Sequence, residues 1–144
     1  PTMFAGRDQV MPQAGLDCSR ELYKKAGIQN PRAEIDCAEI YVPFSWFEAM
    51  WMENLHFAPI NEGWKMTYEG ATALDGDLPV NMSGGVLSTN AIGASGMVRF
   101  AEVAMQIRGQ AGEHQVDGAK KVLGHAYGGG SQYFSMWILG DKPL

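Results

Sequence analysis

Cysteine, charge and long hydrophobic runs are all scarce in this sequence of 144 residues. The two cysteines, Cys18 and Cys37, form no CxxC pair, so we expect no disulfide framework and a reducing, cytoplasmic location. Charged residues make up 19% of the chain with a net charge of −5 and no basic block, which argues against a nucleic-acid partner. No apolar run reaches the length of a membrane span, and the N-terminus lacks the pattern of a signal peptide.

Hydrophobic residues are plentiful, at 46% of the chain, which suffices for a packed core and excludes wholesale disorder. The length suits one ordinary domain rather than two. The chain begins at Pro1 and not at an initiator Met. We therefore expect it to be processed or to be part of a longer protein.

Hydrophobic periodicity and turn residues divide the chain into an irregular lead-in, residues 1–15, and a domain, residues 16–144. The expected elements, in order, are a helix over 16–26, a buried strand over 33–42, a helix over 45–56, loops or short strands over 57–79, a helix over 97–108 and strands over 120–125 and 133–139. This order predicts an α/β layered domain with a mixed sheet.

Local signals set the ends of these helices. Asp17 or Ser19 is the expected N-cap of the first helix, and Gly27 its C-terminal stop. Ser45 and Glu48 fit a capping box at the start of the second. The helix over 97–108 is apolar almost all round, which predicts that it is buried on every side.

A loop rich in Gly, Ser and Asn precedes that helix, with the sequence NMSGGVLSTNAIGASG over residues 81–96. It matches neither a P-loop nor a dinucleotide-binding fingerprint. Such a loop is more often structural, because Gly and Asn supply tight turns. Its position at a helix N-terminus favours a second interpretation, because free backbone N–H groups there attract an anion or oxyanion.

The segment HAYGGG, residues 125–130, is the more informative motif. It combines a potential base, a tyrosine and glycines that let a ligand approach bare backbone amides, as in an oxyanion hole. An ordinary glycine-rich strand connection is about equally probable from this segment alone. The isolated His56 and His114 give little support for a metal site. The aromatic and methionine-rich helix Trp46–Met52 is best explained as core or subunit interface.

Four separated segments form one set: ELYKKAGIQNPRAEIDCAEI (21–40), GATALDGDLPVNMSGG (70–85), GASG (93–96) opening a helix, and HAYGGG (125–130). In this order they resemble the C-terminal half of the thiolase superfamily. They look most like the sterol-carrier-protein-x and lipid-transfer branch of the thiolase-like, acetyl-CoA acetyltransferase-like acyltransferases. The resemblance covers nearly all of residues 16–140. It implies a thiolase-like layered fold, a mixed sheet flanked by helices, of which this chain is the C-terminal half.

The sequence departs from the family pattern at three motifs. Tyr41-Val42-Pro43-Phe44 stands where family members have Asn-Glu-Ala-Phe or His-Asp-Cys-Phe. Thr89-Asn90-Ala91 replaces Gly-His-Pro, and Ala126-Tyr127-Gly128 replaces Cys-x-Gly. His125 with Gly128 agrees with the His-Asn-x-Gly of the lipid-transfer branch.

The resemblance implies a coenzyme A thioester as substrate and no metal in this chain. The leading hypothesis is an acyltransferase that makes or cleaves a carbon–carbon bond beside the thioester, with its nucleophilic Cys in an N-terminal half outside this chain. An Asn at position 90 can donate a hydrogen bond but cannot shuttle a proton. Proton transfer then falls to His125, Tyr127 or Tyr41. The remaining expected oxyanion or substrate-binding residues are Gly128, Gly129, Gly130 and Ser88.

Two other functions stay open at this point. The missing acid/base residues resemble thiolase-like retro-aldolases of steroid side-chain degradation, in which tyrosines act and no acyl-enzyme forms. The chain could also be a non-catalytic subunit that binds acyl-CoA or lipid. The resemblance implies as partners the thiolase N-terminal half, a second copy in a homodimer of full units, and a zinc-ribbon/OB-fold accessory protein. Thiolase halves pack their central helices together, so an isolated chain is expected to aggregate through the helix over 97–108.

Overall fold

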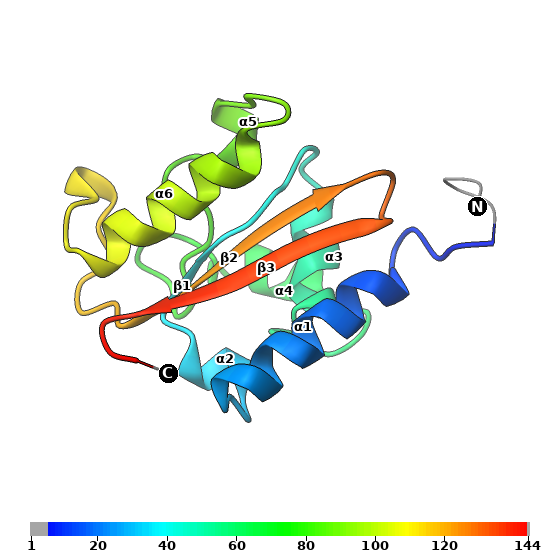
Figure 1. Ribbon diagram of the computed structural model, residues 1–144, viewed down its shortest axis with the longest axis horizontal. Helices are drawn as coiled ribbons and strands as arrows, with labels where there is room; N and C mark the ends of the chain where they lie inside the picture. The colour runs from blue at the N-terminus through cyan, green and yellow to red at the C-terminus, as the bar shows by residue number, and fades with distance from the viewer. Residues whose placement is uncertain (1–5, 144) are drawn as a thin grey trace.

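A computed structural model describes residues 6–143 of the chain (Figure 1). The helices are α1 (Gln13–Ala26), α2 (Pro31–Glu34), α3 (Phe47–Asn54), α4 (Gly63–Tyr68), α5 (Gly85–Ser88), α6 (Ser95–Ile107) and the 3-10 turn η1 (Gly112–His114). The strands are β1 (Cys37–Glu39), β2 (Lys121–Gly128) and β3 (Tyr133–Gly140). The predicted mixed sheet flanked by helices is confirmed.

The three strands form one sheet in the order β1-β2-β3. β2 and β3 are an antiparallel hairpin, with Gly128 opposite Tyr133. β1 runs parallel to β2, with Glu39 opposite Gly124. A parallel pair needs a long crossover, and the crossover here contains α3 to α6. As a result, the C-terminal ends of β1 and β2 lie at the same edge of the sheet.

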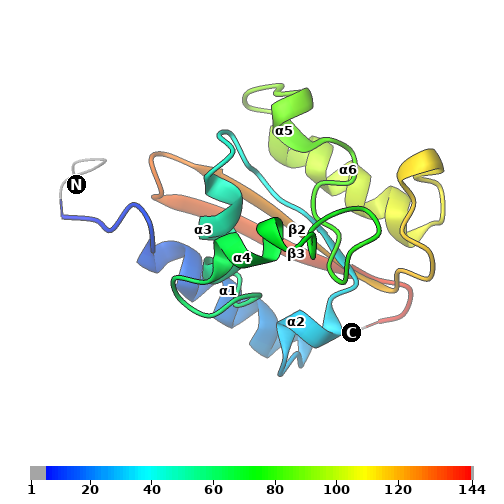
Figure 2. The same cartoon turned by 180° about the vertical axis from the view of Figure 1, so that it is seen from behind.

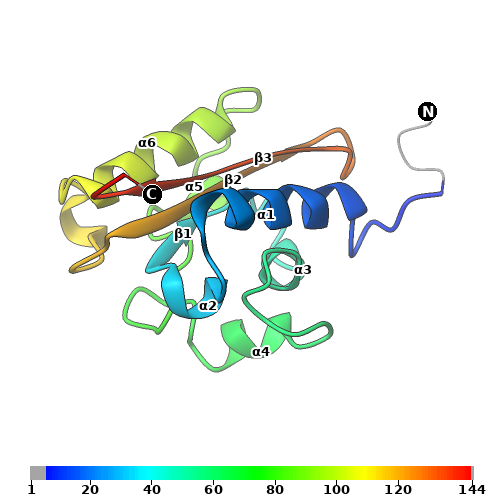
Figure 3. The same ribbon diagram turned by 60° about the horizontal axis from the view of Figure 1, so that its bottom comes forward.

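Helices cover both faces of the sheet. α6 lies on one face, and α1 lies on the other with α3 and α4 beyond it (Figures 2 and 3). The larger apolar core, which includes Trp51, Met52 and Leu55, fills the space between the sheet and the α1–α3 layer. A smaller one around Cys37, Val103 and Val122 lies under α6. Cys37 is therefore a core residue, and the methionine-rich helix supplies core side chains, as predicted.

The first helix starts earlier and is capped differently than predicted. α1 begins at Gln13 inside the expected lead-in, with Pro12 at the N-cap and no side-chain cap. The Ser19 hydroxyl instead donates to the carbonyls of Leu16 and Asn54, so Ser19 anchors α1 to the end of α3. Gly27 ends the helix with a φ of 69°, as predicted.

The strand predicted over 33–42 is mostly wrong. Pro31 starts the short helix α2, and the Glu34 carboxylate accepts the N–H groups of Gln29 and Asn30. These local bonds hold the first part of the segment in a turn, and only Cys37–Glu39 pairs with the sheet.

The capping box at Ser45 is also wrong. α3 begins at Phe47 without a side-chain cap, because the Glu48 carboxylate accepts the hydroxyls of Thr67 and Thr72. The segment predicted to be loops or short strands contains the helix α4 as well.

α6 is not apolar on every side. Its buried face carries Ser95, Arg99, Val103 and Gln106, so two long polar side chains point into the protein. Met97 on the opposite face is 69% exposed. The helix is inverted relative to an ordinary surface helix, with polar groups inside and apolar groups outside. No helix within residues 6–143 is long and apolar enough to cross a membrane.

Candidate functional site

Two tyrosines meet at the sheet edge where β1 and β2 end. Tyr41 follows β1 by two residues, and Tyr127 is the penultimate residue of β2. Because the two strands are parallel, both side chains reach the same edge, and their ring centroids lie 5.8 Å apart. Ligands of α/β sheets bind outside the carboxyl ends of parallel strands, so this edge is the candidate active site.

The backbone of Tyr41 is held from two sides. Its N–H donates to Nδ1 of His125 at 3.3 Å, and its carbonyl accepts the indole N–H of Trp51 at 2.7 Å. Trp51 and His125 are both fully buried. These two bonds give Tyr41 a defined position although it lies outside the strand.

Asn90 joins the site from the loop between α5 and α6. Its Oδ1 accepts the hydroxyl of Ser95 at 2.7 Å and the hydroxyl of Tyr41 at 3.4 Å. Oδ1 is therefore occupied by donors, which leaves the Nδ2 amino group to donate to another partner. An exposed amide donor beside a tyrosine hydroxyl can stabilise negative charge on an oxygen atom.

His125 lies beneath the site and not at its surface. Its ring is 0% exposed and packs against Trp51 and Phe134, with centroids 5.2 and 5.7 Å away. Burial lowers the pKa of His125 to about 3, so the ring is neutral near pH 7. Since Nδ1 accepts the Tyr41 N–H, the proton is on Nε2, which has no hydrogen-bond partner among the described residues. This geometry suits support of Tyr41 better than proton exchange with a ligand.

The buried His125 leads to a prediction about stability at acid pH. Below the unfolded-state pKa of 6.5 the unfolded chain binds a proton there, whereas the folded chain does not until about pH 3. Stability is therefore lost as pH falls from 6.5 towards 3, by about 1.4 kcal/mol per pH unit. Urea unfolding of wild type and a His125→Gln variant at pH 6.5, 5.5 and 4.5 measures this slope. Equal slopes in the two proteins would contradict the assignment.

The other predicted donors are glycines in the turn between β2 and β3. Gly129 and Gly130 have φ values of 61° and 57°, a left-handed conformation that glycine adopts readily. The turn directly follows Tyr127 and Gly128, so its backbone amides lie at the same edge as the tyrosines. Ser88 ends α5, and no hydrogen bond among residues 6–143 connects it to Tyr41 or Asn90. Its binding role stays a prediction.

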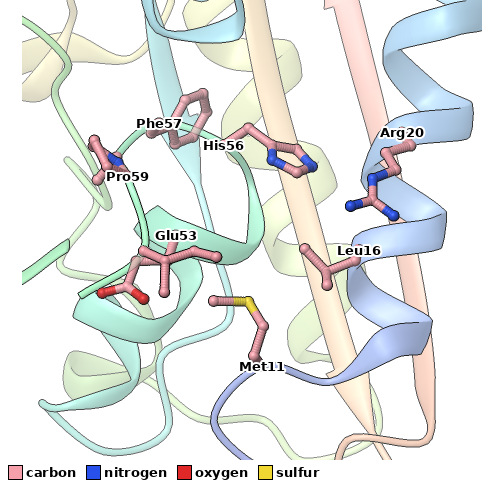
Figure 4. A pocket seen from close by; sticks show the side chains of 9 residues that line it. Met11, Leu16, Arg20, Glu53, His56, Phe57 and Pro59 are labelled. Carbon is pink, nitrogen blue, oxygen red and sulfur yellow. The ribbon is translucent and has the colours of Figure 1, made fainter. Parts of the chain in front are cut away.

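Of the cavities that lie away from the tyrosine pair, two border α1 and the exposed face of α6. One of about 450 Å³ lies between α1 and the end of α3 (Figure 4). Its lining residues are Met11, Leu16, Arg20, Glu53, His56, Phe57, Ala58, Pro59 and Ile60. The other, of about 460 Å³, lies beside the exposed face of α6 at Met97 and Phe100. Neither contains a predicted site residue. Within the part of the chain that the structure describes, no three His, Cys, Asp or Glu side chains cluster in a way that could hold a metal ion.

The sequence analysis did not identify two buried residues, Glu39 and Arg99, that lie next to the site residues in the interior of the protein. Glu39 and Arg99 form a buried ion pair, with 3.3 Å between Oε2 and Nε. Burial raises the pKa of Glu39, while the N–H of Ser83 and the charge of Arg99 act in the opposite direction. The sequence did contain a signal for this pair, because Glu39 lies in a segment predicted to be a buried strand and Arg99 in a helix predicted to be buried. Charged side chains are rarely buried unless they are paired.

Comparisons with known proteins identify the family. The family model described as thiolase C-terminal domain-like matches residues 2–141. The chain therefore belongs to the thiolase C-terminal domain-like family. It is 36% identical to an acetyl-CoA acetyltransferase of Methanothermobacter thermautotrophicus over 85% of this chain and 32% of that protein. It is 34% identical to human sterol carrier protein 2 over 97% of this chain and 26% of that protein.

A solved structure has the same fold. The "Ltp2-ChsH2(DUF35) aldolase" superposes on 89% of this chain and 32% of its own, with a TM-score of 0.77 and 26% identity. The chain thus spans about a third or less of the length of the relatives it matches. The activity and partners of a whole protein are therefore matters of proposal.

Proposed function

We propose that this chain is the acid/base half of a thiolase-fold enzyme that makes or breaks a carbon–carbon bond beside a coenzyme A thioester. The observation that carries the proposal is the contact between the Tyr41 hydroxyl and Asn90, with Tyr127 adjacent. It supports the proposal because a hydroxyl able to exchange a proton lies next to an amide that would donate to the thioester oxygen. Membership of the thiolase family supports the substrate class.

The geometry favours retro-aldol cleavage of a β-hydroxyacyl-CoA. One tyrosine, acting as its phenolate, takes up the proton of the β-hydroxyl, and the bond between Cα and Cβ breaks to release an aldehyde or ketone. The electron pair moves into the thioester as an enolate, whose oxygen accepts from Asn90 Nδ2 and the Gly128–Gly130 amides. The second tyrosine then returns a proton to Cα. These steps need neither a nucleophilic thiol nor free coenzyme A, and the solved aldolase with this fold supports this reaction.

Acyl transfer is the second candidate, favoured by the identity to an acetyl-CoA acetyltransferase. In that reaction a Cys outside this chain carries the acyl group, and free coenzyme A is consumed when the carbon–carbon bond is cleaved. Asn90 and the glycine amides would stabilise the same enolate. The two reactions therefore differ in the nucleophile and in the need for coenzyme A.

One experiment separates the two reactions. The full-length protein, with any subunits that copurify, is given a β-hydroxyacyl-CoA without coenzyme A and, separately, a β-ketoacyl-CoA with coenzyme A. Release of a carbonyl product in the first mixture supports the aldolase, and thiolysis in the second supports the acyltransferase. Acyl-CoA binding without turnover in either mixture would indicate a non-catalytic subunit and contradict the proposal.

The exposed apolar face of α6 is the proposed contact for the thiolase N-terminal half. Phe100, which contacts Trp137 on the sheet, is 41% exposed, and with Met97 it borders the cavity beside α6. We propose in addition a homodimer of complete units and a zinc-ribbon/OB-fold accessory protein. The neighbouring aldolase structure, which contains a second component by its name, supports the accessory protein.

This contact predicts how the isolated chain behaves. We expect residues 1–144 alone to self-associate at tens of micromolar, because α6 presents apolar side chains to water. A Met97→Ser/Phe100→Ser variant is expected to shift towards monomer in sedimentation velocity. The matched control, Ile60→Ser/Tyr68→Ser, removes exposed apolar groups from outside α6 and should leave association unchanged. A monomeric wild-type chain would refute this prediction.

A further inference from the structure

The buried carboxylate of Glu39 is bonded to both ends of the segment that carries Asn90. Its Oε1 accepts the backbone N–H of Ser83 at 3.0 Å, and its Oε2 accepts the Ser83 hydroxyl at 2.9 Å. The same Oε2 lies 3.3 Å from Nε of Arg99. Ser83 precedes the loop that contains Asn90, and Arg99 lies one turn into the helix that follows it. One carboxylate thus anchors the loop before and after the site residue.

These contacts continue into a closed ring that passes through the site. Arg99 follows Ser95 by four residues, so both project from the same face of α6. Ser95 donates to Asn90, Asn90 accepts from Tyr41, and Tyr41 follows Glu39 by two residues along the chain. Every side of the ring is a hydrogen bond, an ion pair or a short stretch of backbone. The ring therefore sets the distance between the Tyr41 hydroxyl and the Asn90 amide.

The segment before the loop is also held to the strand by Asn81, whose Oδ1 accepts the N–H of Ile40 at 2.7 Å, whereas the loop itself is exposed. Residues 87–94 are exposed, and Ile92 is among the most exposed apolar side chains of the described residues. Gly84 and Gly93 both have positive φ values, so the backbone is at its most permissive on either side of Asn90. In contrast, Glu39 is 0% exposed and Arg99 2% exposed. The buried pair is consequently the contact that joins the start of this segment to α6 on its far side.

We infer that Glu39, with Ser83 and Arg99, is a positioning residue that holds Asn90 at hydrogen-bonding distance from Tyr41. This inference rests on the proposed function for its kinetic consequence. It goes beyond that function by giving a catalytic task to a buried ion pair that touches no ligand. If Glu39 contributed only to stability, the activity of a Glu39 variant would decrease in proportion to the fraction of protein that is folded.

The test uses the full-length protein with Glu39→Gln, which keeps the size of the side chain and removes its charge. We expect kcat to fall about 10- to 100-fold, because small displacements of a site group cost about this much, while KM changes less than about two-fold. Hydrogen exchange of residues 84–94 should become faster. The matched control is Glu102→Gln, which removes a carboxylate from α6, the helix that carries Arg99, where it is paired with His114, and should change neither kcat nor exchange.

A double variant separates positioning from stability. Replacement of both members of a buried pair commonly restores stability, so Glu39→Gln/Arg99→Met should regain the melting temperature lost in Glu39→Gln. The inference requires that its kcat stay low. Recovery of kcat together with the melting temperature would overturn it.

Two further outcomes remain decisive. If Glu39→Gln does not fold, Ser83→Ala removes the hydroxyl contact to Glu39 and the acceptor for the Gly85 N–H but keeps the backbone contact, and it is expected to lower kcat about 3- to 10-fold with faster exchange of residues 84–94. If wild type does not turn over acyl-CoA, the proposed function fails, whereas the exchange comparison between Glu39→Gln and Glu102→Gln still tests the positioning. Unchanged exchange in Glu39→Gln would contradict the inference in either case.

Discussion

Replacement of Tyr41 by Phe is expected to lower kcat for acyl-CoA cleavage by about 10²- to 10⁴-fold, the usual contribution of a positioned acid or base. The change removes only the hydroxyl that meets Asn90. The ring stays beside Tyr127, and the backbone bonds to His125 and Trp51 are unaffected. Steady-state kinetics of the full-length protein measure the effect.

The control for Tyr41 is the same substitution at an exposed tyrosine. Tyr68 on α4 is 83% exposed, so Tyr68→Phe should leave kcat unchanged. The expected loss in Tyr127→Phe is comparable to that in Tyr41→Phe if the two tyrosines divide the roles of acid and base. Full activity in both single variants would show that the proton moves through another group.

Replacement of Asn90 by Ala is expected to lower kcat by about 10²- to 10³-fold, the cost of removing one donor from an oxyanion site. The reason is the loss of Nδ2, since Oδ1 already accepts from Ser95 and Tyr41. The loss should appear in kcat more than in KM, because the enolate oxygen gains its full charge only during the reaction.

Asn90→Asp distinguishes the donor from the support of the loop. An aspartate can accept the same bonds from Ser95 and Tyr41, but it cannot donate and it repels a developing negative charge. Its kcat should be at least as low as that of Asn90→Ala, although its hydrogen exchange over residues 84–94 should match wild type. Asn90→Asp with wild-type turnover would remove Asn90 from the proposed mechanism.

The elements that the sequence predicted best are those whose signals are local. Strands were expected over 120–125 and 133–139, and β2 and β3 include all of these residues except Lys120, because apolar side chains lie on both sides of a run of glycines. α6 was expected from residue 97 and begins at Ser95. Gly27 ends α1 because the left-handed conformation that terminates many helices is adopted most readily by glycine. Residues 33–42 failed because the bonds of Glu34 to Gln29 and Asn30 overrode their apolar pattern.

In the candidate site, too, the sequence identified individual residues but not the contacts between distant ones. The resemblance singled out Tyr41, Asn90, His125 and Tyr127 in separate motifs, and the fold brings them to one edge of the sheet. It did not indicate that His125 is buried with its Nδ1 on the backbone of Tyr41. It also missed Glu39, whose role depends on Arg99, a residue 60 positions away in a different element.

The sequence by itself determined the class of fold, the family and the residue types available for chemistry. The reason is that hydrophobic periodicity, the positions of glycines and the order of motifs depend only on the order of residues along the chain. Only the tertiary structure decided which of those residues meet. A parallel pairing of β1 with β2 places Tyr41 beside Tyr127, and a buried ion pair under α6 sets the loop of Asn90 against them. Contacts between residues 49 and 84 positions apart depend on strand register and helix rotation, which the packing of the whole domain selects.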